Sequence, residues 1–276
     1  MIFQGDVLFR LNRKECPMCG GDARVLASVR TIDPDSSEEV DLRECRHCRH
    51  WWHSPVPDRD ELIRMYSTAS SAVVDSGARE SYASKVYIDY FQTRVLSATA
   101  GAPRSNYLEI GPGGGHLLRR LREKGHVCFG VDPGQWTSDP WILPSLEQIP
   151  PAIVFDGFIL QDVIEHLFDP IETLVALRRK AGPSAALFCS FPCNESRPAR
   201  RYRERWAMVR PFGHMHYFSL QSSSEMLHRS GWSVVATKLT RTTPLRWSLR
   251  NRDLRAVAYE LVKGGRDQLH VSAIAR

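Results

Sequence analysis

The sequence predicts an α/β protein in which helices cover a mostly parallel sheet, with a small cysteine-bearing module ahead of it. Two observations lead to this prediction. Beyond residue 105, short apolar runs alternate with segments whose apolar residues recur at helical spacing. Ahead of that pattern stand two CxxC pairs, in "ECPMCGG" and "ECRHCRHWWH". We therefore divide the chain into three parts, residues 1–53, 54–104 and 105–276.

Composition narrows the class of protein. The 276 residues suffice for one large core and an accessory module, and 42% hydrophobic with 25% charged residues is ordinary for a soluble globular protein. No apolar run could span a membrane, and the N-terminal stretch lacks a signal peptide's apolar region, so we expect a cytoplasmic protein without membrane contact. The net charge of +6 is compatible with an acidic or phosphorylated substrate, with nucleic acid or with neither. The oligomeric state stays open.

The two CxxC pairs are typical of a zinc ribbon. They are separated by 25 residues, and Gly20 and Gly21 allow the first knuckle to turn tightly. Between the knuckles, "DARVLASVR" and "EEVDLRECRHC" suit short strands. Nothing near the pairs has the strand–helix setting of a redox CxxC. We expect a structural Zn²⁺ whose four positions are all filled by sulfur, from Cys16, Cys19, Cys45 and Cys48.

The middle part, residues 54–104, reads as a helical linker or lid. It opens with the proline-rich junction "SPVPDRDE", in which Asp58 suits a helix N-cap. The segments "ELIRMYSTA" and "SYASKVYIDYFQTRVLSAT" then carry apolar residues at helical spacing. Tyr82, Tyr87 and Tyr90 could form a lid over a site, although aromatic residues at this spacing more often pack in a core.

Strands and helices then alternate in the third part. "NYLEIG", "HVCFGVD", "FDGFILQDVI" and "SAALFCSFP" predict buried strands. "GHLLRRLREKG" predicts an amphipathic helix that stops at Gly125, and "DPIETLVALRRKAGP" a helix that starts at Pro170 and is ended by Gly182 and Pro183. "SLQSSSEMLHRSGW" predicts a serine-capped helix. "SVVATKLT" and "LHVSAIA" follow as strands, for which we expect an antiparallel pair at one edge.

A glycine-rich turn in "LEIGPGGGHLL" joins the first of these strands to its helix. Gly111, Gly113 and Gly115 permit positive φ and close approach of the backbone to a ligand. The third glycine comes one residue too early for the dinucleotide fingerprint, and Glu109 would repel a pyrophosphate but attract a cation. Asp132 ends the second strand, where a carboxylate can accept hydrogen bonds from ribose hydroxyls. The pattern predicts a nucleoside ligand with positive charge and no phosphate.

At this point the sequence resembles a known family. "YLEIGPGGGHLLRRLREKGHVCFGVDP" is similar to the cofactor half of class I S-adenosylmethionine-dependent methyltransferases, and "SLEQIPPAIVFDGFILQDVIEHLFDPIETL" to their following segment. "GHMHYFSLQSSSEMLHRSGWSVV" resembles the small-molecule branch, which includes ubiquinone-biosynthesis O-methyltransferases and methyltransferases of polysaccharide and natural-product clusters. The resemblance covers about residues 106–235. It implies a Rossmann-like seven-stranded sheet with one antiparallel edge strand.

The resemblance also implies roles for single residues toward S-adenosylmethionine. The three glycines would pass under its methionine and ribose, and Asp132 would bind the ribose hydroxyls. The remaining roles fall to Glu109 at the cationic end, Leu146 at the adenine and Gln161 beside the sulfur. The stretch "DPGQWTSDPWILPSL" is short and broken by prolines, so we expect the helix and third strand of the family to be reduced there.

Candidate catalytic groups follow the fourth strand and precede the last helix. Methyl transfer is an in-line displacement, and a base is needed only if the acceptor must lose a proton. In "QDVIEHLFDP", His166 could act on a hydroxyl or bond the loop backbone, and Glu165 would brace the loop. In "GHMHYFS", His214 and His216 would point the same way if extended. They could line the acceptor pocket, join His166 at a metal whose third ligand the sequence does not fix, or belong to the core.

The leading hypothesis is a small-molecule methyltransferase that methylates a hydroxyl of a sugar or secondary metabolite, with N- and C-methylation left open by the sequence. The segment "RPARRYRERWAMVR" holds six arginines and one acid, so it could meet the phosphates of a nucleotide-linked acceptor or form a solvated face. An alternative is a ribosomal-RNA or tRNA methyltransferase that grips RNA with the ribbon and these arginines. Against it, "QDVIEH" stands where an NPPY-like amino-group clamp would be. A third hypothesis, a non-catalytic cofactor-binding protein, is disfavoured by the intact glycine turn and Asp132.

Overall fold

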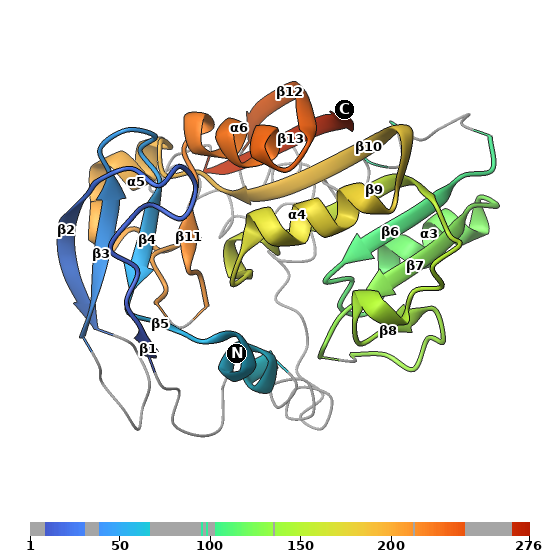
Figure 1. The fold of residues 1–276 in the computed structure, drawn as a ribbon, viewed down its shortest axis with the longest axis horizontal. Coiled ribbons are helices and arrows are strands. Elements are labelled where there is room, and N and C mark those ends of the chain that lie inside the picture. Colours follow the sequence, from blue (N-terminus) through green and yellow to red (C-terminus); the bar gives the residue numbers. More distant parts are fainter. Residues whose placement is uncertain are drawn as a thin grey trace, which may run out of the picture.

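The structure is a computed structural model of the chain. It describes residues 9–30, 39–66, 95, 98, 103–134, 136–211, 213–240 and 267–276. A large sheet flanked by helices lies beside a smaller sheet formed mainly by the N-terminal part of the chain (Figure 1). Tyr82, Tyr87 and Tyr90 lie outside the described residues.

The large sheet has seven strands in the order β12-β13-β10-β9-β6-β7-β8. Its central strands pair in parallel, and their residues are almost all buried, as expected for strands covered on both faces. This confirms the predicted α/β, Rossmann-like architecture. The strands are β6 (Asn106–Ile110), β7 (Val127–Val131), β8 (Ile142–Leu143), β9 (Phe155–Gln161), β10 (Ala181–Pro192), β12 (Trp232–Thr240) and β13 (Gln268–Ala275).

The last two strands form the predicted antiparallel pair at one edge, but the strand that runs against the rest of the sheet is β13, and the expectation that this strand would itself be the edge strand is wrong. β13 pairs antiparallel with both β10 and β12, so it lies between them and β12 forms the edge. The chain leaves β12 at Thr240 and returns along it in β13, and this return places the later strand inside the sheet. At the other end, β8 is only two residues long, in agreement with the expected reduction of the third strand.

The helices begin where the sequence supplies caps. Asp169 accepts a hydrogen bond from the Glu172 amide at the start of α4 (Pro170–Arg179), and Ser219 forms a capping box with Ser222 at the start of α6 (Leu220–Arg229). α4 ends at Arg179, earlier than predicted, because Gly182 and Pro183 already belong to β10. The others are α3 (His116–Glu123), α5 (Arg197–Tyr202) and the 3₁₀ turns η1 (Leu146–Gln148), η2 (Ile164–His166) and η3 (Arg203–Arg205). No helix of the described residues is long and apolar enough to cross a membrane.

The two faces of the sheet have separate cores. On one face, Tyr107 of β6 packs with the buried leucines of α3, such as Leu118. On the other face, Leu108 packs in a cluster with Leu174 of α4 and Leu227 of α6. Alternate residues of β6 therefore serve opposite cores, as the two-residue period of a strand requires. The second cluster also includes Met18 and Trp52, so the cysteine module shares a core with the large sheet.

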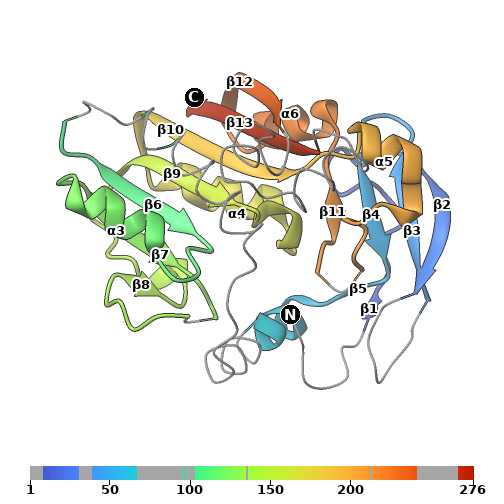
Figure 2. The same ribbon diagram turned by 180° about the vertical axis from the view of Figure 1, so that it is seen from behind.

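The smaller sheet, in the order β11-β4-β3-β2, takes three strands from the N-terminal part of the chain and one from residues far along it. Its N-terminal strands are the two predicted between the knuckles and one after them, and together with the knuckles they form what we call the cysteine module. The fourth strand, β11, comes from the segment that follows α5 and η3, and Figures 1 and 2 both show it beside β4. The strands are β2 (Ala23–Arg30), β3 (Glu39–Cys45), β4 (Trp51–Ser54) and β11 (His216–Tyr217). β1 (Phe9–Leu11) pairs separately with β5 (Val56–Pro57), and residues 59–66 are helical.

The Tyr217 hydroxyl ties β11 to both parts of the molecule. It lies 2.8 Å from Nε2 of His53, accepts a hydrogen bond from the Arg210 amide at 3.0 Å and donates one to the His214 carbonyl at 3.2 Å. Tyr217 and His53 are fully buried. A single hydroxyl therefore fixes both ends of the turn at residues 210–214 against the cysteine module.

We expect Tyr217→Phe to lower the free energy of unfolding by about 1–3 kcal/mol, because it leaves buried polar partners unsatisfied. Urea denaturation measures this change. Tyr202→Phe is the matched control, because Tyr202 is 37% exposed and should lose less than about 0.5 kcal/mol. Equal stability of the two variants would contradict the bonding role assigned to the Tyr217 hydroxyl.

Candidate functional site

The glycine turn lies at the carboxyl ends of the parallel strands, where the direction of the sheet order reverses. From β6 the chain continues outward through β7 and β8, and it then returns to β9 on the other side of β6. Such a switch point opens a crevice between the two diverging connections. The turn after β6 and the end of β9 therefore face the place where an open α/β sheet binds its ligands.

The three predicted glycines all adopt positive φ, at +66° for Gly111, +50° for Gly113 and +71° for Gly115. A Cβ on Gly111 would stand 2.5 Å from Cγ2 of Val163, so the turn packs tightly against the loop after β9. A Cβ on Gly113 would meet nothing within 4 Å. A Cβ on Gly115 would stand 2.8 Å from Cδ1 of Ile142, so Gly111 and Gly115 are packed positions, and the open position at Gly113 offers backbone for close approach by a ligand.

Asp132 faces this turn from the end of β7. Its Oδ2 accepts a hydrogen bond from the Gly113 amide at 3.1 Å, and its Oδ1 accepts bonds from the Gly134 amide at 2.9 Å and from Nε1 of Trp136 at 3.2 Å. Burial raises the pKa of Asp132, and these three bonds act in the opposite direction. The sequence did not reveal Trp136, which stands in the proline-broken stretch without any local motif.

Glu109 is a buried carboxylate directly before the turn. It is 4% exposed, and its Oε2 has no hydrogen-bond partner among the described residues. Burial, with a smaller effect of Asp132, raises the pKa of Glu109 to about 8. A carboxyl group of this kind is stabilised in its charged form when a cation binds beside it.

Gln161 and Leu146 complete the set expected around the cofactor. Gln161 is the last residue of β9, half-buried, and its Nε2 also has no partner among the described residues. Leu146 starts η1 and packs partly buried against the core cluster that includes Leu108. No helix occurs in the described part of residues 133–145, which agrees with the expected reduction.

Glu165 and His166 lie in η2, just beyond β9, and His214 is held beside them. The Met215 amide donates to the Glu165 carbonyl at 2.9 Å, which fixes the two segments side by side. The rings of His166 and His214 meet edge to face, with centroids 4.6 Å apart. One ligand-type atom from each of the three residues lies within 4.8 Å of the other two. The structure thus supplies the third member that the sequence could not name.

His214 and His216 do not point the same way, contrary to the expectation from their spacing. His214 ends a turn in which its amide donates to the Arg210 carbonyl, so the segment is not extended there. His216 lies in β11, and its Nδ1 is 3.1 Å from Nε2 of the buried His50 in the cysteine module. His216 therefore contacts the cysteine module, and His214 alone joins His166.

Burial dominates the ionisation of these groups. It lowers the pKa of His166 to about 4 and that of His214 well below its ordinary value, and the positive charge of Arg210 adds to both effects. Burial also raises the pKa of Glu165 well above its ordinary value, with a further contribution from Asp162. Both imidazoles are therefore neutral near pH 7.

A cavity of about 210 Å³ opens beside His166, and we call it the acceptor cavity. It lies between the helix at residues 59–66 and the loop after β9, and Pro133, the neighbour of Asp132, is part of its wall. The Tyr66 hydroxyl is 2.9 Å from Nδ1 of His166. Sequence reasoning missed Tyr66; the aromatic residue that ends the "ELIRMY" helical pattern was the available signal. The wall also includes Arg59, Leu62, Ile63, Phe168 and Thr173.

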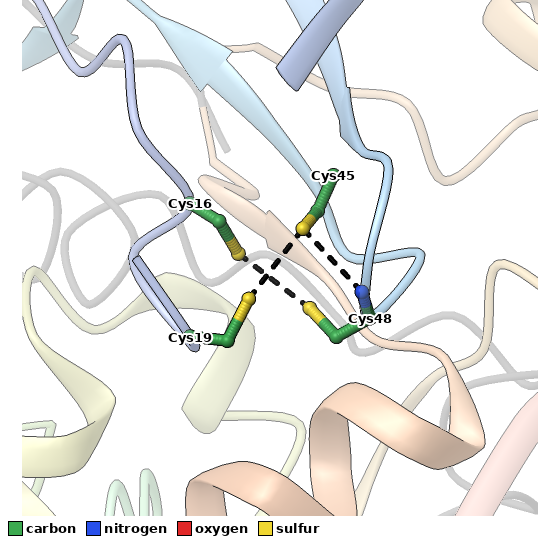
Figure 3. A group of neighbouring side chains, drawn as sticks. All are labelled: Cys16, Cys19, Cys45 and Cys48. Atoms are coloured by element: carbon green, nitrogen blue, oxygen red, sulfur yellow. Dashed lines mark hydrogen bonds between the residues drawn. The ribbon is translucent and has the colours of Figure 1, made fainter. Parts of the chain in front are cut away.

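The four knuckle cysteines converge on one point (Figure 3). Sγ of Cys16 is 3.6 Å from Sγ of Cys48, and Sγ of Cys19 is 3.5 Å from Sγ of Cys45; none of these cysteines forms a disulfide. Sulfurs arranged tetrahedrally at about 2.3 Å from a zinc ion lie about 3.8 Å apart, so the residues present fit a four-sulfur metal site. A Cβ on Gly21 would stand 3.3 Å from Sγ of Cys19, which accounts for a glycine in this knuckle.

The arginine-rich segment forms α5, η3 and the loop after them. All six arginines of residues 197–210 are exposed. Arg210 is the member near the site, because its charge acts on both His166 and His214.

Comparisons with known proteins agree with this fold. Residues 81–237 match the model of a family described as a methyltransferase domain. A search of the curated proteins found no match.

Solved structures that resemble the chain include methyltransferases with the demethylated cofactor product bound. The 1,6-didemethyltoxoflavin-N1-methyltransferase of Burkholderia thailandensis, bound to 1,6-didemethyltoxoflavin and S-adenosylhomocysteine, has a TM-score of 0.57 and 12% identity over 92% of this chain and 98% of that one. The magnesium protoporphyrin IX methyltransferase of Synechocystis PCC 6803, with bound S-adenosylhomocysteine, has a TM-score of 0.52 and 14% identity over 79% and 100%. The [4+2]-cyclase SpnF has a TM-score of 0.56 and 14% identity, and the match covers 80% of this chain and 97% of that one. These likenesses show a common fold.

The family model covers more than half of the chain. The protein therefore belongs to the methyltransferase-domain family and is an S-adenosylmethionine-dependent methyltransferase.

Proposed function

We propose that the enzyme transfers the methyl group of S-adenosylmethionine to a hydroxyl of a small anionic molecule, such as a nucleotide-linked sugar or a secondary metabolite. The observation that carries this proposal is the acceptor cavity. At about 210 Å³ it suits a sugar-sized group, and its wall joins the neighbour of Asp132 to His166. An acceptor in this cavity would therefore lie between the cofactor residues and a group that can act on its hydroxyl.

The cofactor residues divide according to charge. Asp132 would accept hydrogen bonds from the ribose hydroxyls in place of its present donors, and Gly113 leaves room for the backbone to approach. Glu109 would face the positively charged methionyl end, where its unpartnered oxygen gains a partner. Gln161 would offer its unpartnered amide N–H beside the methionyl end of the cofactor, and Leu146 would offer apolar surface to the adenine.

The acceptor side carries positive charge and a neutral histidine. Arg59 lines the acceptor cavity, but it is paired with Glu172 and shares the wall with Asp169. The positive charge that favours an anionic acceptor therefore comes mainly from Arg210 near His166. His166 is the group that we expect to act on the acceptor hydroxyl, because its side chain is 23% exposed whereas that of its neighbour Glu165 is 1% exposed. Holding donor and acceptor in line would supply much of the acceleration.

We further propose that the cysteine module is a zinc ribbon with a structural role. Four sulfurs already complete a tetrahedral site, which leaves no coordination position for substrate. Three of the four cysteines are buried, in keeping with a closed site.

The first expected outcome concerns cofactor affinity. Asp132→Ala should weaken binding of S-adenosylmethionine by about 10- to 100-fold, because hydrogen bonds to a charged group contribute about 1.5–3 kcal/mol each. Isothermal titration calorimetry measures the change, and Asp22→Ala, at an exposed position, should bind as the wild type does. Absence of binding by folded wild-type protein would refute the cofactor assignment.

The second concerns the proton on Glu109. Its pKa of about 8 means that the carboxyl is largely protonated at pH 7, and a bound cation favours the charged form, so cofactor binding should release a proton. The binding enthalpy measured at pH 7 should then vary with the ionisation enthalpy of the buffer. We expect Glu109→Gln to abolish most of this variation. A wild-type enthalpy that is the same in all buffers would contradict the role of Glu109.

The third concerns the acceptor. With isotopically labelled S-adenosylmethionine and a panel of nucleotide-linked sugars, we expect label in a methyl ether of a small molecule. His166→Ala should lower kcat by about 100-fold or more while cofactor affinity is kept, whereas His228→Ala, at an exposed position of α6, should change neither. Label in RNA instead of small molecules would favour the RNA methyltransferase alternative.

The fourth concerns zinc. Elemental analysis after dialysis against a chelator should find one retained zinc per chain, because a closed four-thiolate site releases its ion slowly. Cys16→Ser should lose that zinc and lower the melting temperature. Cys128→Ala removes a buried thiol outside the knuckles and should keep the zinc. Retention of zinc by Cys16→Ser would exclude this site as its ligand set.

A further inference from the structure

We propose that Glu165, His166 and His214 form a second metal site, for a divalent transition-metal ion, beside the acceptor cavity, whose wall includes His166. The site is distinct from the four cysteines. The binding of the ion is independent of the proposed function. Only the role of the ion in activating the acceptor hydroxyl rests on that function.

Both imidazoles have one ring nitrogen already engaged by an oxygen. Nδ1 of His214 is 2.9 Å from the Met208 carbonyl oxygen, and Nδ1 of His166 is 2.9 Å from the Tyr66 hydroxyl. A carbonyl oxygen only accepts, so Nδ1 of His214 carries the proton and Nε2 has a free lone pair. The same arrangement at His166 lets Nδ1–H donate to Tyr66. Metal-binding histidines are held in this way, with the second nitrogen bonded to an oxygen.

Glu165 supplies a buried carboxylate of which one oxygen is unpartnered in the described part of the chain, while its own backbone amide acts on the group. Its side chain is 1% exposed, and its Oε2 has no hydrogen-bond partner among the described residues. Its Oε1 is 4.0 Å from Nε2 of His166, too far for a hydrogen bond but close enough for two ligands of one ion after a small contraction. A buried charged group is costly without a counter-charge, and a cation at this point would supply one.

The donor set indicates the kind of ion. Two imidazole nitrogens and one carboxylate oxygen suit Mn²⁺, Fe²⁺, Co²⁺, Ni²⁺ or Zn²⁺, and three protein ligands leave coordination positions open. Asp162, whose charge raises the pKa of Glu165, adds negative potential, whereas the charge of Arg210 opposes a cation. Because these two surrounding charges oppose each other, the selection of the ion depends on the three ligands and not on the electrostatic potential around them.

The ion would bind the oxygen of the acceptor hydroxyl, because His166 is part of the wall of the acceptor cavity, and His166 would then act on the hydroxyl through the ion that it holds and not as the base itself. Coordination lowers the pKa of the hydroxyl, whose proton passes to water. The alkoxide oxygen then forms a bond to the methyl carbon as the carbon–sulfur bond breaks, and the bonding pair stays on sulfur. The products are a methyl ether, S-adenosylhomocysteine and one proton.

The test is metal uptake by the full-length protein. Wild-type enzyme is first dialysed against a chelator, so that only tightly held zinc remains, and is then equilibrated with Mn²⁺ or Zn²⁺ at up to 1 mM. Elemental mass spectrometry counts the metal per chain. We expect one exchangeable ion per wild-type chain and at least a tenfold weaker affinity for Glu165→Gln and His214→Gln, with the retained zinc unchanged. Glu123→Gln and His116→Gln, at exposed positions, are the matched controls and should bind as the wild type does.

Two variants are used because one of them could fail to fold. Thermal unfolding shows which variants are folded, and a single folded variant is enough for the test. No exchangeable ion in the wild type, or equal uptake by a folded Glu165→Gln or His214→Gln variant, would overturn the proposal. Cofactor binding and methyl transfer are measured on the same samples. Methyl transfer without ion uptake would refute the metal site alone, whereas ion uptake without cofactor binding would refute the proposed function alone.

Discussion

The antiparallel pairing of β11 with β4 is the contact on which the arrangement of the catalytic side depends. It places His216 opposite Trp52 and Tyr217 opposite Trp51, so a strand next to His214 completes the sheet of the cysteine module. The His53–Tyr217 bond and the bond from Ser219 to the Cys48 carbonyl strengthen the same seam. The position of His214 against His166 is therefore set by residues far apart in the sequence.

Desolvation gives the site its chemical character. Glu109 and Glu165 are carboxyl groups in surroundings that disfavour their charged forms, while His166 and His214 are imidazoles kept neutral. In the proposed function, a cation bound beside Glu109 would favour the charged form of its carboxyl group, so ligand binding and ionisation would be coupled there.

Local patterns revealed the cofactor half of the site, and long-range contacts decided the rest. The glycine turn, Glu109 and Asp132 lie within one strand–turn–helix–strand unit, whose geometry follows from residues close in sequence. The CxxC pairs are equally local. By contrast, Tyr66 and His166 are 100 residues apart, and His50 and His216 are 166 apart, so no period or motif relates them. The insertion of β13 and the divergence of His214 from His216 likewise depend on tertiary pairing.

The inserted position of β13 also has a consequence for biosynthesis. β10 and β12 do not pair with each other; each pairs with β13, which is the last strand in the sequence. Until residues 268–275 have left the ribosome, both earlier strands present an open edge of unpaired backbone groups. Such edges invite pairing with other chains. The nascent chain is therefore exposed to aggregation between the synthesis of β12 and that of β13, after the candidate site residues have been made.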